Sequence, residues 1–141
     1  MSGYLLDTNC ISEFVRIQPE PAVVAWMEAA DETLLYLSVL TLGEIRKGLA
    51  GLPQSKRRTH LETWLETELR VRFAGRILPI DAGVADRWGS LAARAKSEEK
   101  ALATVDGLLA ATALHHNLTV VSRNVNNFKN THVPVLNPWK A

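Results

Sequence analysis

The sequence predicts an α/β fold in three layers, with helices on both faces of a central parallel sheet of four to five strands. Short runs of uninterrupted apolar residues alternate along the chain with segments whose apolar residues recur at helical spacing. Those short runs lack polar and apolar alternation, which is typical of strands buried on both faces. At 141 residues, 47% of them apolar and 22% charged, we expect one domain spanning residues 1–141.

The composition argues against several classes of protein. Cys10 is the single cysteine, which excludes an internal disulfide and a cysteine-rich zinc site and favours a reducing, cytoplasmic location. No apolar run approaches the roughly 18–20 residues of a membrane span. No basic stretch precedes the first apolar residues, so no signal peptide is expected. Lysine and arginine total 16 against 15 acidic residues, so nucleic-acid binding would depend on how the charges are distributed.

The first half of the chain is expected to contain two strands and four helices. The first strand ends at Asp7, where residues that favour caps and turns begin a helix. Pro21 suits the first position of a helix, and Gly51 and Pro53 end another. In order, we expect a strand at 4–6, a helix after Thr8, a helix at 21–29, a strand at 34–39, a helix at about 40–49 and an amphipathic helix at 54–73.

The second half is expected to hold the remaining strands and two long helices. Pro79 places the apolar run at 76–80 at an edge or a strand end, and Asp81 opens the helix that follows. A helix at 104–115 is apolar almost all round, which indicates a core position. The remaining elements are a strand at 118–121, a polar loop at 122–129 and a possible strand at 133–135.

Three carboxylates follow the predicted strands or begin the helices beside them. Asp7 follows the first strand, Glu44 is in the helix after the second, and Asp106 is in the first turn of the buried helix. In parallel sheets such positions meet beyond the carboxyl ends of the strands. Three neighbouring acids repel one another unless protonated or neutralised, and Mg²⁺ or Mn²⁺ prefers oxygen ligands. The pattern therefore favours phosphoryl-transfer or nuclease chemistry.

Each acid also has a purely structural interpretation. Asp7 is placed to cap a helix beginning near Thr8, and Thr41 with Glu44 three residues later fits a capping box. The helix dipole favours Asp106 near a helix N-terminus, although its apolar neighbours make an unpaired charge costly. Helix caps have no need to share one sheet edge, so the three positions together favour a functional role.

Four segments resemble PIN domains in order and spacing across nearly the whole chain. They are LLDTNCISE at 5–13, LSVLTLGEIRKG at 37–48, TVDGLLAATA at 104–113 and LTVVSRN at 118–124. The chain is most similar to VapC toxins of the FitB-like branch, which also end in a sequence like NPW at 137–139. The resemblance implies an Mg²⁺- or Mn²⁺-dependent endoribonuclease from a type II toxin–antitoxin pair. It also implies a homodimer, which can join a larger assembly, and a VapB-like or FitA-like antitoxin whose C-terminal segment fills a groove.

The resemblance also assigns residues to roles. The catalytic and metal-binding residues would be Asp7, Glu44 and Asp106, with Asn9, Ser122 and Asn124 as supports. Related sequences carry a further acid where this chain has Asn124 or Asn127, and no Asp or Glu follows Asp106. An amide does not neutralise a cation or act as a general base, so we expect one divalent ion. Two alternatives stay open: a PIN domain that binds RNA or a protein without cleavage, and a PIN nuclease outside a toxin–antitoxin pair.

Candidate RNA-binding residues come from the uneven distribution of basic side chains. Arg46 and Lys47 lie about one turn beyond Glu44, and Arg123 follows the last acidic region of the chain. Phosphate contacts of this kind supply most of the sequence-independent affinity for RNA. We expect Arg46 to contribute most among them.

Overall fold

The computed structural model describes residues 3–140 and contains a five-stranded parallel sheet in the order β3-β2-β1-β4-β5. The strands are β1 (Tyr4–Leu6), β2 (Leu35–Ser38), β3 (Ile77–Leu78), β4 (Thr119–Val121) and β5 (Val135–Leu136). In register, Tyr4 of β1 is opposite Leu35 of β2 and Thr119 of β4. The first strand is therefore the centre of the sheet, and the predicted parallel arrangement is confirmed.

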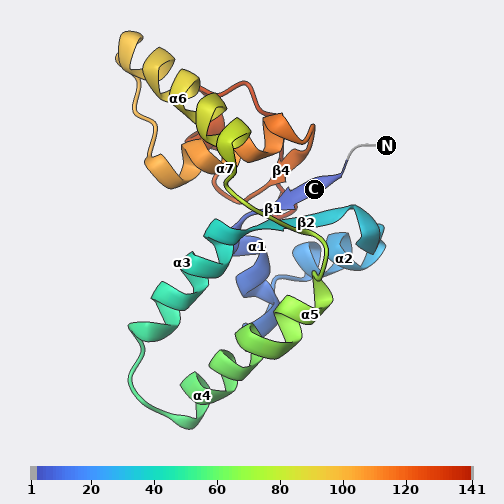
Figure 1. Cartoon of the computed structure of the whole chain (residues 1–141). Helices are drawn as coiled ribbons and strands as arrows, with labels where there is room; N and C mark the ends of the chain where they lie inside the picture. Colours follow the sequence, from blue (N-terminus) through green and yellow to red (C-terminus); the bar gives the residue numbers. More distant parts are fainter. Residues whose placement is uncertain (1–2, 141) are drawn as a thin grey trace.

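Successive residues of β1 enter two different hydrophobic clusters, one on each face of the sheet. Leu6 packs with the helices of the first half of the chain, whereas Leu5 packs with the helices of the second half. This is the alternation of side chains expected along a strand, and it produces the three layers. Figure 1 shows α6 and α7 above the sheet and α1 to α5 below it.

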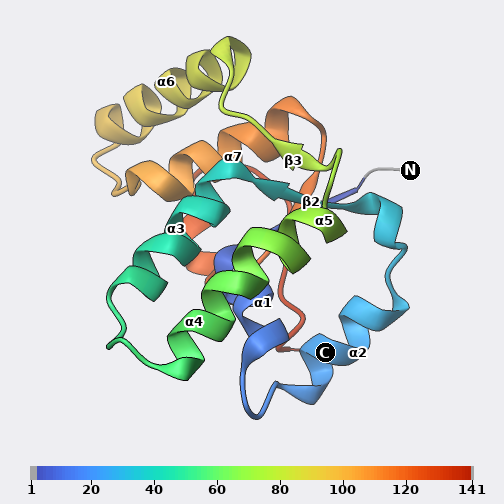
Figure 2. The same ribbon diagram turned by 60° about the horizontal axis from the view of Figure 1, so that its bottom comes forward.

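The layer below the sheet contains five α-helices and a π-helical segment. They are α1 (Thr8–Ser12), α2 (Pro21–Ala29), α3 (Val39–Ala50), α4 (Lys56–Thr63), the π-helical η3 (Trp64–Leu69) and α5 (Arg70–Arg72), with short 3₁₀ turns η1 (Glu13–Val15) and η2 (Glu32–Leu34). In Figure 2, α1 lies centrally, with α2, α3 and α4 around it. The single helix predicted at 54–73 is thus observed at 56–72, with a π-helical stretch in its middle.

The layer above the sheet is formed by two long helices and a short turn. It consists of α6 (Ala82–Ser97) and α7 (Thr104–His115), followed later in the chain by the 3₁₀ turn η4 (Val125–Phe128). Asp81 caps α6 by accepting a hydrogen bond from the Val84 amide, as expected. The loop predicted at 122–129 contains η4, whose Phe128 is fully buried, and the last strand begins at Val135.

The structure also bears on the expected lack of a membrane span and on the single cysteine. Within residues 3–140, no helix is both long enough and apolar enough to cross a membrane. Cys10 is buried, its thiol donates to the Val121 carbonyl at 3.2 Å, and burial raises the pKa of that thiol well above its usual range. Cys10 therefore packs in the core and is not a reactive thiol.

Candidate active site

The carboxyl ends of the two central strands lie side by side and carry polar side chains. Leu6 of β1 pairs with Val121 of β4, so Asp7 and Ser122, the next residue in each strand, are neighbours. The Asp7 amide continues the ladder by donating to the Val121 carbonyl at 2.9 Å. This pairing places a carboxylate and a hydroxyl together where the sheet opens.

Asp7 is held by hydrogen bonds to both carboxylate oxygens. Its Oδ1 accepts from the Thr8 amide at 2.8 Å, which makes Asp7 the cap of α1, and its Oδ2 accepts from the Ser122 hydroxyl at 2.7 Å. The side chain is 8% exposed. The capping interpretation is therefore confirmed, and the cap also fixes the carboxylate at the sheet edge.

Glu44 is connected to Asp7 through Thr8. The Thr8 hydroxyl donates to Glu44 Oε1 at 2.7 Å, while the Thr8 amide donates to Asp7. The sequence indicated Thr8 only as the start of a helix, and this link between the two acids was not predicted. The available signal was a hydroxyl directly beside the first candidate acid.

The capping-box interpretation of Glu44 is wrong. The cap of α3 is Ser38, whose hydroxyl accepts from the Leu40 amide at 3.0 Å. Thr41 therefore lies inside the helix, fully buried, and its hydroxyl has no hydrogen-bond partner within residues 3–140. Glu44 is left without a capping role, which strengthens its assignment to the site.

Asp106 lies in the first turn of α7 and is half-buried. Burial raises the pKa of its carboxyl, and the negative charges of Asp7 and then Glu44 raise it further. Charge–charge effects of this kind require the groups to be near one another. The structure thus brings the three predicted acids into one electrostatic environment.

Ser122 is the centre of the supporting hydrogen bonds. It is fully buried, and its Oγ accepts from Asn9 Nδ2 at 3.4 Å and from the Asn124 amide at 3.0 Å while donating to Asp7. Asn9 Oδ1 in turn accepts from the Arg123 amide at 3.3 Å. Asn9 and Ser122 therefore lie where the sequence placed them, whereas Asn124 contributes its backbone and exposes its side chain.

The donor set matches the chemistry of a hard divalent cation, because all three candidate ligands are carboxylates. Burial first, and then the charges of Asp7 and Glu44, raise the pKa of the Asp106 carboxyl, and a bound cation would favour its charged form. Within residues 3–140, however, no three His, Cys, Asp or Glu side chains form a ready metal-binding cluster. Thr8 links Asp7 to Glu44, whereas no hydrogen bond within residues 3–140 joins Asp106 to either of them.

The predicted RNA-binding residues have differing surroundings. Arg46 forms ion pairs with Glu62, at 3.7 Å, and with Glu66, so it links α3 to α4 and the π-helical segment. Lys47 is exposed. The Arg123 guanidinium lies over the Trp139 ring, 5.7 Å from its centroid. The structure thus gives Arg46 an ion-pairing role between helices that the sequence did not reveal.

The sequence and the fold match a known class of protein. The PIN domain family model matches residues 4–133, and the chain belongs to this family. It is 40% identical over 136 residues to the VapC ribonuclease Y4jK of Sinorhizobium fredii, covering 96% of this chain and 97% of that protein. It is 44% identical over 135 residues to toxin FitB of Neisseria gonorrhoeae, with coverage of 96% and 97%. Among solved structures, the crystal structure of FitAcB from Neisseria gonorrhoeae matches with a TM-score of 0.93 at 43% identity, covering 98% of this chain and 99% of that one.

Proposed function

We propose that this protein is the toxin of a type II toxin–antitoxin pair and a divalent-metal-dependent endoribonuclease that hydrolyses RNA phosphodiester bonds. The observation that carries this proposal is the link from Asp7 through Thr8 to Glu44 at the sheet edge, with Asp106 near enough for their charges to raise the pKa of its carboxyl. Full-length similarity to a protein named VapC ribonuclease and to toxin FitB supports it. The expected ion is Mg²⁺ or Mn²⁺.

In this proposal, the residues of the site have two roles: three bind the cation and two position the ligands. Asp7, Glu44 and Asp106 would hold the cation, which when bound activates water and stabilises charge on the phosphate. Ser122 fixes Asp7, and Thr8 fixes Asp7 and Glu44 together. Because these bonds lock the carboxylates before substrate arrives, little reorganisation is required during the reaction.

We predict that the site binds one divalent ion. Asn124 and Asn127 stand where relatives of the family carry acids, and both are exposed amides in the structure. Titration calorimetry with Mn²⁺ should give one binding event per chain, and Asp106→Ala should abolish it. Two equivalent tight sites would contradict the prediction.

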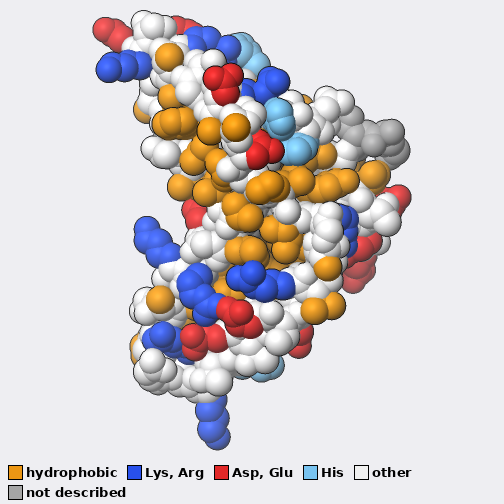
Figure 3. All heavy atoms as spheres, viewed as in Figure 1, with side chains coloured by type: hydrophobic (Ala, Val, Ile, Leu, Met, Phe, Trp, Pro, Cys, Tyr) orange, Lys and Arg blue, Asp and Glu red, His pale blue; other side chains and the backbone are white. Residues whose placement is uncertain are grey.

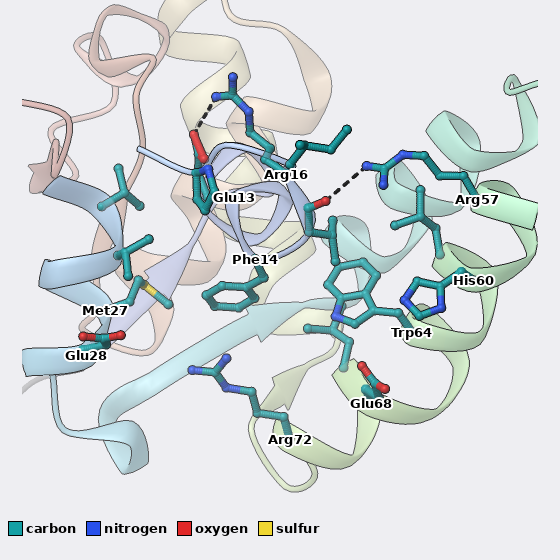
Figure 4. Close-up of a pocket in the computed structure, with 17 residues that line it drawn as sticks. Glu13, Phe14, Arg16, Met27, Glu28, Arg57, His60, Trp64, Glu68 and Arg72 are labelled. Atoms are coloured by element: carbon teal, nitrogen blue, oxygen red, sulfur yellow. Dashed lines mark hydrogen bonds and ion pairs between the residues drawn. The ribbon is translucent and has the colours of Figure 1, made fainter. Parts of the chain in front are cut away.

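A groove between η1, α2 and the α4–η3 helix is our candidate site for the antitoxin segment. Its volume is about 780 Å³, and Figure 4 shows Phe14, Met27 and Trp64 along it with charged side chains around them. Ile17, which also lines the groove, is 84% exposed. An apolar floor with a charged rim suits an amphipathic peptide segment.

Growth of a bacterial host tests the proposed toxin role. Induced expression of the wild-type protein should arrest growth, whereas Asp7→Asn expressed at the same level should not. Coexpression of the cognate antitoxin should restore growth to cells with the wild-type toxin and restore it poorly to cells with Ile17→Asp. Unchanged growth with well-expressed wild-type protein would contradict the proposal.

The homodimer expected for this family has a candidate surface at the outer edge of the sheet. Figure 3 shows hydrophobic side chains across the middle of the face that includes this edge. Leu40, Leu78 and Ile80 are only partly buried there, and β3 is an edge strand. Light scattering should therefore give twice the chain mass, and a monomer at high micromolar concentration would refute the dimer.

One observation favours a second candidate function, a PIN domain that binds RNA or a protein without cutting. The amides Asn124 and Asn127 leave the site with three acids. A protein that binds metal and RNA but shows no cleavage would support this alternative. Cleavage without an antitoxin partner would instead indicate a PIN nuclease of another cellular role.

A further inference from the structure

A second cavity opens beside Asp106, one of the three proposed catalytic acids. Its volume is about 650 Å³, and Asp106 forms part of its wall. The other polar side chains that line it are Lys100, Asn126, Asn127, Lys129 and Asn130. One wall is thus the start of α7 and the loop before it, and the other is η4 and the residues that follow.

The cavity has one lysine without an ion-pair partner among the described residues. Lys100 and Lys129 face a single carboxylate, Asp106, and no acidic residue exists in the sequence after position 106. Lys100 pairs with Glu98 at 3.3 Å. Lys129 is exposed and takes part in none of the ion pairs found within residues 3–140. Its ammonium group is therefore available to an anion that enters the cavity.

The remaining polar lining is made of amides. The side chains of Asn126, Asn127 and Asn130 take part in none of the hydrogen bonds found in the described part of the chain. Each amide offers two donors and an acceptor, which match base edges and ribose hydroxyls. An acid at position 127 would instead add a second negative charge beside Asp106 and repel a phosphate.

From this lining we infer that the cavity binds the stretch of single-stranded RNA next to the bond that is cut. Lys129 contacts a backbone phosphate, and the asparagine amides contact the adjoining base or ribose. The inference rests on the proposed ribonuclease function and adds the side of the site on which the substrate lies. It places the RNA on the α7 and η4 side, whereas Arg46 is occupied by Glu62 and Glu66. Lys129 and Asn127 are thus positioning residues.

RNA binding without cleavage tests this inference. Fluorescence anisotropy of a fluorescein-labelled single-stranded RNA of mixed sequence, measured in EDTA over a salt series, gives the affinity and its salt dependence. Lys129→Ala should weaken binding about three- to tenfold and reduce the slope of log affinity against log salt by about 0.7, the value for one lost phosphate contact. Lys129→Arg should restore both quantities. Asn127→Asp should weaken binding as well.

Lys56→Ala, at the exposed start of α4, is the matched control and should leave affinity and slope unchanged. Equal affinity and slope for Lys129→Ala and wild type would overturn the inference, as would wild-type protein with no measurable affinity. A loss of binding in Lys47→Ala with none in Lys129→Ala would place the RNA on α3 instead. Failure of the ribonuclease proposal would show separately, as wild-type protein that binds the RNA yet never cuts it when Mg²⁺ or Mn²⁺ is supplied.

Discussion

Asp7→Asn should reduce RNA cleavage by about a thousandfold, which corresponds to about 4 kcal/mol of transition-state stabilisation. Asparagine keeps the shape of the side chain, so its oxygen can still accept from the Thr8 amide. The hydrogen bond from Ser122 is lost, because its hydroxyl oxygen already accepts from Asn9 and from the Asn124 amide. The substitution therefore removes the charge while keeping the cap on α1, and Ser122→Ala measures the effect of the lost hydrogen bond separately. Initial rates on a labelled RNA with saturating Mn²⁺ measure the effect.

Two companion variants make that result specific. Ser122→Ala removes one hydrogen bond from Asp7 but keeps the negative charge, so its loss of rate should be much smaller. Asp86→Asn changes an exposed aspartate on α6 and should leave the rate of cleavage unchanged. Wild-type activity in Asp7→Asn would remove Asp7 from the catalytic site.

Phe128→Ala should lower the free energy of unfolding by about 3–5 kcal/mol, the usual cost of deleting a fully buried aromatic side chain. Phe128 ends η4 and packs in the cluster that contains Leu5 and Val120, so it attaches this turn to the sheet. The Thr131 hydroxyl donates to the Phe128 carbonyl at 2.6 Å, which holds the end of the turn in shape. Urea denaturation followed by circular dichroism measures the change.

Val125→Ala provides the control for this prediction, because Val125 lies in the same turn but is 38% exposed. Its effect on unfolding should be a small fraction of the effect of Phe128→Ala. Equal destabilisation by the two variants would show that η4 is not anchored through Phe128.

Local signals in the sequence were sufficient for most of the fold. Pro21 at the helix start and the nearly all-apolar stretch at 104–115 predicted α2 and α7 with the bounds observed. Continuous apolar runs predicted the parallel sheet, and Pro79 predicted an edge strand or a strand end. Strand β3 lies at the edge of the sheet and ends at Leu78, directly before Pro79. The three acids follow strands or begin helices that this topology makes neighbours. The sequence alone was therefore sufficient to predict the candidate site.

The features that the sequence did not reveal depend on contacts between distant residues. The Thr8 hydroxyl bonds to Glu44, which is 36 residues further along the chain. Arg46 on α3 pairs with Glu62 on α4 and Glu66 on η3, beyond the loop that connects these helices. The burial of Phe128 in a polar stretch likewise depends on the helix and strands beneath it. Side-chain partners of this kind follow from packing geometry, which periodicity does not encode.

The most direct test of a ribonuclease built on three acids is cleavage of total RNA by the purified protein in Mn²⁺, Mg²⁺ or EDTA. An Asp106→Ala variant prepared identically controls for contaminating ribonuclease. The account predicts cuts that need Mn²⁺ or Mg²⁺, vanish in EDTA and are absent from the variant. No cleavage by folded, metal-binding wild-type protein, or equal cleavage by Asp106→Ala, would contradict it.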